Sequence, residues 1–479
     1  MRAVKSVLTA AGNLKKKYMD ENESILVLRA INDVNLAKFL SHDLPLFNNI
    51  TSDLFPGTVL PEPDYKDLMR CMKMGLEKMN LQYHDYFIMK TIQLYEMILV
   101  RHGLMIVGLP FSGKTKCIQV LAFALTQLAS EGLMEEMKTH MSTVNPKSIT
   151  QNQLYGNFDE ISHDWSDGVL AVEYRNMASG MSIEDRRWLI FDGPVDAIWI
   201  ENMNTVLDDN RKLCLMSGEV IQMSANMNMI FEPMDLAIAS PATVSRCGMV
   251  YLQPKEMGWK HLYVSWKNNL PPRFDEDQLK VLDSLIFTIV QPCIDYVREQ
   301  ATETAPTEDQ CLLVGCLRIL RVCLKIFEND STWDTYDKKQ IQTIIESSFV
   351  FSSIWSLCCS INTECRRPFD QYYKKVCNGE IESIPKLKNK ILPSAFDRGT
   401  IYDYCYLPET NEWKNWTDFS NKDEIDQFPK GTKPNEIIVT TVDTIRYGYM
   451  QELFIMNDIR SLFVGPTGTG KTAYIQNVL

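Results

Sequence analysis

The chain has 479 residues, of which 45% are hydrophobic and 23% are charged, so it is long enough for roughly three globular domains with large buried cores. Its net charge of −12 argues against binding nucleic acid or anionic lipid, and it favours a solvated surface or a basic protein partner. No apolar run reaches the roughly 18 residues that a membrane span requires, and the first residues lack the apolar core of a signal peptide.

The first 100 residues predict mostly helices. Apolar side chains repeat at helical spacing in residues 1–50 and again in residues 68–97. Between these segments, the proline-containing stretches 53–57 and 60–64 predict a connector.

Residues 108–254 alternate predicted strands and helices, as a doubly wound parallel sheet of the α/β class should. The expected strands are 104–107, 188–192, 229–231 and 248–252. Residues 213–223 predict a hairpin with its turn at Ser217 and Gly218.

The pattern changes after about residue 256, where Pro271 and Pro272 mark a boundary. Long helical patterns follow, at residues 279–297, 310–327 and 340–359. A helical domain after an α/β domain predicts a lid. Residues 400–435 predict a strand or loop connector, and residues 437–455 lead into the last segment.

A glycine-rich loop organises the chain. It lies between the predicted strand 104–107 and a helical pattern at 118–125, which is the context of a phosphate-binding loop. Its N–H groups and the N-terminus of the next helix would face the anion. The spacing assigns Lys114 to the β- and γ-phosphates of ATP and Thr115 to Mg²⁺. The predicted ATP-binding residues are Gly108, Leu109, Pro110, Phe111, Ser112, Gly113, Lys114 and Thr115.

A second copy of this loop follows the apolar run 461–464, for which we expect a strand. Its predicted ATP-binding residues are Gly465, Pro466, Thr467, Gly468, Thr469, Gly470, Lys471 and Thr472, with Thr472 as the Mg²⁺ ligand. The alternative for each copy is an ordinary glycine turn before a helix. Two copies in the same context favour nucleotide binding.

The residues after the predicted strand 188–192 bear on hydrolysis. Asp192 fits the acid that holds Mg²⁺ beside such a loop, although it is also compatible with a simple polar strand end. In many such ATPases, the residue directly after this Asp is a Glu that activates the attacking water. This chain has Gly193 at that position. Asp196 has a shorter side chain than Glu and lies further along the chain. We therefore expect the first site to bind ATP and hydrolyse it slowly or not at all, with Glu201 as the remaining candidate base.

Two more charged residues lie near predicted strand ends. Glu232 takes the position where a polar side chain would sense the γ-phosphate, and an ionised Glu would repel that phosphate. Arg246 precedes the strand 248–252, where an arginine tends to lie at the domain edge. It would act as a finger that stabilises phosphoryl charge in a neighbouring site. The alternative is a surface arginine in a salt bridge.

The 13 cysteines are scattered, and none shows the paired CxxC spacing of a zinc site. We therefore expect reduced thiols and no metal site beyond the Mg²⁺ that accompanies a nucleotide.

With these residues in place, the sequence resembles a dynein heavy chain, of the AAA+ motor proteins, over essentially its whole length. The segments similar to the second AAA+ module of dyneins are FDGPVDA at 191–197, WIENMN at 199–204, VLDDN at 206–210 and ATVSRCGM at 242–249. In that family this module typically holds ATP structurally, which agrees with the missing Glu after Asp192. Residues 60–65 resemble the loop near the adenine.

The resemblance implies α/β AAA+ P-loop NTPase modules, each a doubly wound parallel sheet with a helical lid. Residues 1–50 would be the lid of the preceding, main hydrolytic module, with Arg2 at its sensor position and Arg246 as the finger for its site. The remaining divisions would be a large α/β domain at 51–255, its helical lid at 256–392, and the start of the next module at 393–479, whose Mg²⁺-binding acid lies beyond Leu479.

The resemblance further implies a part of a motor for ATP-driven, minus-end-directed movement on microtubules. Its partners would be the linker, stalk and remaining ring modules of the heavy chain, and intermediate and light chains. Residues 226–233, with Ser240 and Pro241, look more like axonemal than cytoplasmic dyneins and favour an inner-arm chain of the cilium or flagellum. We expect a fragment or a partial gene model, since linker, stalk and tail are missing. The alternatives are a tandem AAA+ ATPase that assembles or remodels proteins, and a scaffold with vestigial loops.

Overall fold

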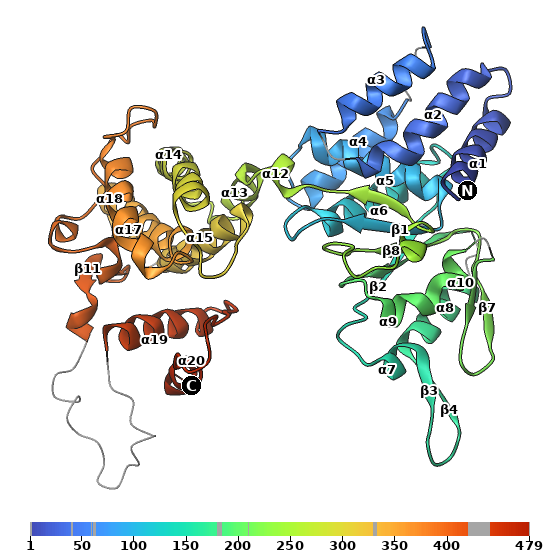
Figure 1. The fold of residues 1–479 in the computed structure, drawn as a ribbon. Helices are drawn as coiled ribbons and strands as arrows, with labels where there is room; N and C mark the ends of the chain where they lie inside the picture. Colours follow the sequence, from blue (N-terminus) through green and yellow to red (C-terminus); the bar gives the residue numbers. More distant parts are fainter. Residues whose placement is uncertain are drawn as a thin grey trace. The chain divides into compact units, whose positions relative to one another are not determined.

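The computed structural model describes residues 2–39, 42–58, 60, 64–179, 184–208, 210–328, 333–419 and 441–478. These residues form two compact units, Met1–Gly258 and Trp259–Leu479 (Figure 1). The finer division into four parts stays a prediction. In the described part, no helix is both long and apolar enough to cross a membrane.

The first unit contains a five-stranded, all-parallel sheet with the strand order β2-β5-β8-β1-β9. Its strands are β1 (Gly103–Val107), β2 (Thr139–Val144), β5 (Arg186–Phe191), β8 (Met227–Phe231) and β9 (Gly248–Tyr251). The predicted doubly wound α/β sheet is confirmed. Strand β1 is buried along its whole length, because a parallel sheet has helices on both faces.

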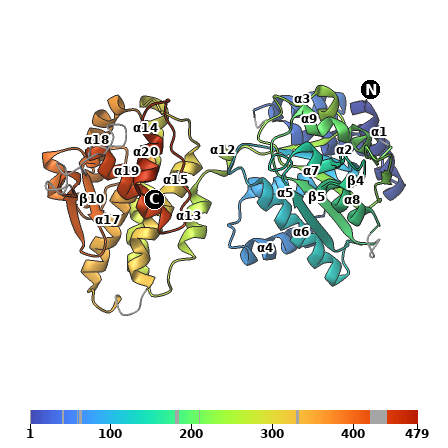
Figure 2. The ribbon, with the colours of Figure 1, turned by 90° about the horizontal axis from the view of Figure 1, so that it is seen from below.

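Alternate side chains of the strands enter two different cores, since successive residues of a strand point to opposite faces. Leu104 and Ile106 of β1 pack with the helices of one face, whereas Met105 and Val107 pack with those of the other. The first layer holds α4 (Lys66–Lys78), α5 (Asp85–Val100), α6 (Lys114–Glu131) and α12 (Pro254–Met257). The second holds α7 (Gln151–Tyr155), α8 (Val169–Ser179), α9 (Ala197–Ile200), η2 (Glu201–Met203) and α10 (Asn204–Leu207). Helices α4 and α6 lie side by side (Figure 2).

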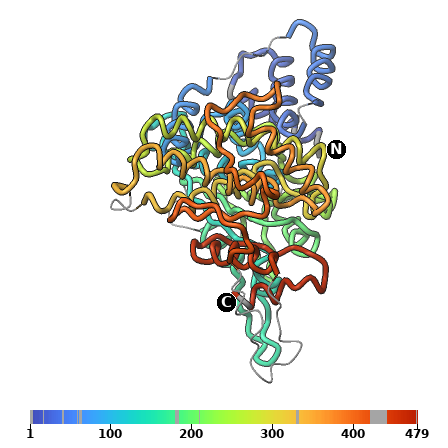
Figure 3. Tube along the Cα trace, turned by 90° about the vertical axis from the view of Figure 1, so that its left-hand side faces the viewer, coloured from blue at the N-terminus to red at the C-terminus, as the bar shows by residue number. Residues whose placement is uncertain are grey.

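The N-terminal residues are helical, as predicted. They form α1 (Arg2–Lys17), α2 (Glu23–Asn35), η1 (Leu36–Lys38) and α3 (Leu44–Leu54). Ala10, Ala30 and Val34 pack together against Val100 at the end of α5. These helices lie at one end of the first unit, and the hairpin of β3 (Gly156–Phe158) and β4 (Trp165–Asp167) lies at the other (Figures 1 and 3).

Several local features differ from the sequence prediction. The helical pattern 68–97 is broken at residues 79–84, where Asn80 adopts a left-handed φ of 51°. Strand β2 was not predicted, because it is an edge strand with mostly polar, partly exposed side chains. The predicted hairpin at 213–223 is confirmed as β6 (Lys212–Cys214) and β7 (Val220–Gln222), with Gly218 in the turn at a φ of 89°.

The second unit is mainly helical, so the predicted lid is confirmed. Its helices are α13 (Lys260–Lys267), α14 (Glu276–Gln300), α15 (Asp309–Cys323), η3 (Leu324–Glu328), α17 (Lys338–Leu357), α18 (Thr363–Asn378), η4 (Ser394–Arg398), η5 (Ile401–Asp403), η6 (Trp416–Phe419), α19 (Val442–Ile455) and α20 (Lys471–Val478). Strands β10 (Tyr404–Leu407) and β11 (Glu412–Asn415) pair with each other. They belong to the predicted connector 400–435 and pack into the same core, whereas residues 420–435 lie outside the described residues.

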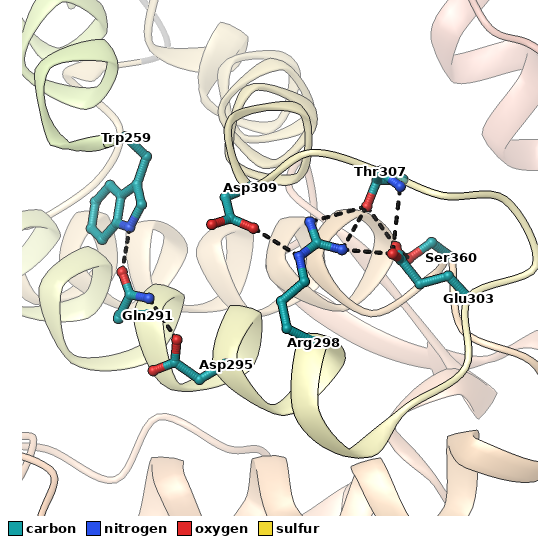
Figure 4. A network of polar contacts seen from close by, with 8 residues as sticks. All are labelled: Trp259, Gln291, Asp295, Arg298, Glu303, Thr307, Asp309 and Ser360. Atoms are coloured by element: carbon teal, nitrogen blue, oxygen red, sulfur yellow. Dashed lines mark hydrogen bonds and ion pairs between the residues drawn. The ribbon is translucent and has the colours of Figure 1, made fainter. Parts of the chain in front are cut away.

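A polar network joins α14 to α15 in this unit (Figure 4). The guanidinium of Arg298 donates to Asp309 at 2.8 Å and to Glu303 at 2.6 Å, and the Ser360 hydroxyl donates to Glu303 at 2.8 Å. Because charge-assisted hydrogen bonds are stronger than neutral ones, these contacts hold the loop between the two helices in place.

The strand predicted at 461–464 is absent: these residues have no regular secondary structure. Leu462 is 86% exposed and Val464 is 58% exposed, so this apolar run is not buried here. A strand needs a partner for its backbone N–H and C=O groups. In the described part of this unit, β10 and β11 pair only with each other.

Candidate functional site

The first glycine loop connects β1 to α6, which confirms the predicted strand–loop–helix arrangement. Gly113 precedes α6 with a left-handed φ of 87°. At Gly108, a Cβ atom would lie 2.4 Å from the backbone oxygen of Leu252. Any larger residue would therefore clash where the loop crosses the end of β9, which explains why the loop starts with glycine.

The two lysines of the glycine loops take the same arrangement. The Lys114 ammonium donates to the backbone oxygens of Gly108 and Leu109. The Lys471 ammonium donates to Gly465 O at 2.8 Å and to Pro466 O at 2.6 Å. Burial lowers the pKa of Lys114, although nearby carboxylates oppose this effect. Each lysine thus folds over its own loop, within reach of an anion bound there.

An open pocket of about 520 Å³ lies beside the first loop, at the carboxyl ends of β5 and β8. Ligands of open α/β sheets bind at this edge. Residues 110–116 line one side of the pocket, and residues 192–194, Glu232 and Met234 line the other. The helix N-terminus and Lys114 make this pocket suitable for a phosphate chain.

The strand register brings two carboxylates to this pocket. Phe191 and Phe231 are paired residues of β5 and β8, and their rings stack 4.9 Å apart in one core. Asp192 and Glu232 directly follow these two residues, and both line the pocket together with the loop and the start of α6. Asp192 is exposed and Glu232 is buried.

The hydroxyl of Thr115 donates a hydrogen bond to Glu232 Oε2 at 2.5 Å. Burial raises the pKa of Glu232, and the hydrogen bond from Thr115 opposes this rise. Thr115, Asp192 and Glu232 supply only oxygen atoms, which are the ligands that Mg²⁺ prefers. These residues fit a Mg²⁺ ion held together with the phosphates of ATP. In the described part, no group of three or more His, Cys, Asp or Glu side chains could hold a metal by itself.

The residues considered for water activation are poorly placed for it. Glu201 begins η2 and does not line the pocket. Gly193 has no side chain. Asp196 caps α9 by accepting from the backbone N–H groups of Ile198 and Trp199 at 3.0 and 3.3 Å, and it forms an ion pair with Lys147. Although burial opposes the effect, the hydrogen bond from Lys147 and those of the backbone lower the pKa of Asp196. Because its oxygens are occupied, Asp196 is poorly suited to accept a proton from water.

Arg246 lies before β9, an edge strand of the sheet, and does not line the pocket. Its guanidinium donates to Asp208 Oδ1 at 2.6 Å and to Ala242 O at 3.0 Å. The position agrees with the predicted domain edge, and the salt bridge agrees with the alternative. The finger role stays a prediction.

Two other predicted site residues lie at the starts of helices. Arg2 begins α1, but its side chain lies outside the described residues. Thr472 is the second residue of α20, directly after the second loop.

Three contacts of the site were not predicted: Glu232 with Thr115, Lys147 with Asp196, and Asp208 with Arg246. Their partners are far apart in the sequence, and no local motif joins them. One further signal could have been found by aligning the two loops. Phe111 has a left-handed φ of 63°, and the corresponding residue of the second loop is Gly468, with a φ of 85°.

A parallel sheet with this strand order, a glycine loop at its carboxyl edge and a separate helical domain define an AAA-type ATP-binding P-loop module. Comparison with known families supports this class. Residues 1–115 match the hydrolytic ATP binding site of dynein motor region, residues 282–418 match the dynein heavy chain AAA lid domain, and residues 426–479 match the P-loop containing dynein motor region.

Individual proteins match along the whole chain. Dynein axonemal heavy chain 3 of Homo sapiens is 46% identical over 491 residues, covering 100% of this chain and 12% of the relative. Dynein axonemal heavy chain 12 of Rattus norvegicus is 46% identical over 492 residues, covering 100% and 16%. Dynein axonemal heavy chain 1 of Mus musculus is 40% identical over 506 residues, covering 100% and 12%. The chain therefore belongs to the axonemal dynein heavy chains, and it spans a small part of their length, within the AAA motor region.

Proposed function

We propose that the central module binds MgATP as a structural part of the motor ring and hydrolyses it slowly or not at all. The observation that carries this proposal is the pair Gly193 and Asp196: the first lacks a side chain, and the second is held by Lys147 and by the N-terminus of α9. A bound ligand that is not consumed stabilises the folded state continuously, by about 2.7 kcal/mol at a concentration 100 times its dissociation constant.

The module would also act on its neighbour. Arg246 lies at the edge of the sheet, outside its own nucleotide pocket. It would supply a positive charge to the site of the preceding module, where Arg2 would be a sensor. An arginine supplied from a neighbour accelerates phosphoryl transfer by 10³- to 10⁵-fold in well-studied cases.

The names of the matched relatives include the word axonemal, and this supports a place in the axoneme of a cilium or flagellum. We further propose, from the sequence resemblance, that the whole protein moves along microtubules as an inner-arm chain. Its linker, stalk and remaining ring modules, together with intermediate and light chains, would be the partners of this segment. The second loop would bind ATP with Mg²⁺ through Thr472.

Lys114→Ala in the full heavy chain tests the structural role. We expect the variant to lose the nucleotide bound at the first loop and to melt at a lower temperature, with most of its ATP turnover retained. Lys66→Ala is the matched control, because Lys66 is an exposed lysine at the start of α4 whose side chain is 90% accessible. Thermal melting and steady-state ATPase are measured on the same samples. A collapse of turnover with unchanged stability would contradict the proposal.

A further inference from the structure

The hydrogen bond between Thr115 and Glu232 joins the predicted Mg²⁺ ligand to the residue in the γ-phosphate sensor position. The two residues come from the start of α6 and from the end of β8, and they are 117 positions apart. Glu232 is 5% exposed, so its carboxylate is directed into the site and not toward solvent.

The direction of this hydrogen bond matters for cation binding. A threonine hydroxyl carries one proton and two lone pairs. When the proton is donated to a carboxylate, the lone pairs of the oxygen are free for a cation. Groups that orient a metal ligand in this way typically change metal affinity by 10- to 100-fold when they are removed.

We propose that Glu232 is a positioning residue for Mg²⁺ in this module: it holds the Thr115 hydroxyl with its lone pairs toward the ion, and it adds a second negative charge beside Asp192. This inference rests on the proposed binding of MgATP. Under this proposal, the side chain in the sensor position helps to bind the Mg²⁺ that accompanies ATP and does not contact the γ-phosphate. A site with two carboxylates would retain the cation, and with it the nucleotide, more tightly.

Phosphate repulsion is the competing explanation for Glu232, and it makes the opposite prediction. If Glu232 only repels the phosphates, Glu232→Gln should tighten ATP binding at every Mg²⁺ concentration. If Glu232 positions Thr115, Glu232→Gln should weaken the binding of Mg²⁺ and leave ATP binding without Mg²⁺ unchanged or tighter.

The test titrates Mg²⁺ into the full chain in the presence of a fluorescent ATP analogue, and repeats the titration with Mn²⁺ followed by electron paramagnetic resonance. We expect Glu232→Gln to raise the Mg²⁺ concentration needed for half-maximal nucleotide binding by about tenfold, and to change the Mn²⁺ spectrum. Glu160→Gln is the matched control, since Glu160 is an exposed glutamate in the turn between β3 and β4.

Variants of Thr115 give a second, independent measurement. Thr115→Val removes the hydroxyl at constant shape and should weaken Mg²⁺ binding by a similar factor, whereas Thr115→Ser should preserve it. In the Thr115→Val background, Glu232→Gln should have a smaller effect than in the wild type, because the hydrogen bond is already absent and only the negative charge of Glu232 is lost. If Glu232→Gln does not fold, Glu232→Asp replaces it: the shorter side chain keeps the charge but withdraws the carboxylate from the Thr115 hydroxyl, so Mg²⁺ binding should still weaken, and an unchanged Mg²⁺ dependence would overturn the positioning role.

The possible outcomes separate this inference from the proposed function. A Mg²⁺ dependence that is the same in Glu232→Gln and wild type, or ATP binding that tightens at every Mg²⁺ concentration, overturns the positioning role. If instead the wild-type chain binds no ATP analogue at the first loop, the proposed function itself fails.

Discussion

The Nε atom of Arg246 donates a hydrogen bond to Asp208 Oδ1 at 2.6 Å, and the arginine side chain is only 14% exposed. The residue proposed to act on a neighbouring site is therefore held within its own module. Charge-assisted hydrogen bonds of this length are strong, so Asp208 limits how far the guanidinium can extend toward another nucleotide.

Arg246→Ala should lower ATP turnover at the site of the preceding module by at least about tenfold in the full heavy chain. Asp208→Asn should leave that turnover at or above the wild-type level, because it weakens the contact that retains the guanidinium. Single-turnover ATPase kinetics measure both effects. Unchanged turnover in Arg246→Ala removes the finger role, and an equal loss in Asp208→Asn contradicts the retaining contact.

Gly193→Glu should introduce measurable hydrolysis at the first loop, because it places a carboxylate directly after Asp192, where many such ATPases have their base. The backbone tolerates a side chain here, although a Cβ atom would lie 3.2 Å from Asn145 Oδ1. Gly193→Ala is the control for this crowding. We expect phosphate release from the first site in the Glu variant only, measured with the preceding site disabled. Equal rates in both variants would show that the missing side chain does not limit hydrolysis.

Variants of Phe111 test whether the backbone of the first loop is strained. Its left-handed φ of 63° is unfavourable for a residue with a Cβ atom, and its side chain is 39% exposed. Phe111→Gly and Phe111→Ala both remove the ring, but only glycine relieves the backbone. We expect Phe111→Gly to be more stable than Phe111→Ala by about 1 kcal/mol, from chemical denaturation. The opposite order would mean that the loop rearranges without the ring.

Asp33 should make stability depend on pH. Burial raises its pKa from 3.8 to about 7; the charge of Glu96 adds to the rise and Arg29 opposes it. The folded state therefore binds this proton more tightly than the unfolded state does, so the free energy of unfolding should fall as pH rises from about 4 to about 7. In Asp33→Asn this fall should be smaller, by on the order of 1 kcal/mol.

Denaturation of the wild type and Asp33→Asn at about pH 5 and about pH 8 measures this difference. Asp20→Asn is the control, because Asp20 is an exposed aspartate in the turn before α2. A variant whose pH dependence equals that of the wild type would show that Asp33 titrates alike in the folded and unfolded states.

Local sequence patterns predicted much of this molecule. The first glycine loop lies between a buried apolar run and a helical pattern, so its secondary structure depends on neighbouring residues. The end of β5 before Asp192 and the β6–β7 hairpin were predicted for the same reason. The second loop shows where this reasoning fails: residues 461–464 are apolar but form no strand, because a strand also needs a partner from elsewhere in the chain.

The amino-acid sequence by itself therefore determined the class of the protein and the positions of the two glycine loops, and it predicted the missing base at Gly193, since each of these depends on adjacent residues. Only the tertiary structure decided which side chains meet: Glu232 with Thr115, Lys147 with Asp196, and Asp208 with Arg246. These contacts depend on the order and register of the parallel strands. The strand order and register are set by packing among residues far apart in the sequence, so they cannot be predicted from a local pattern.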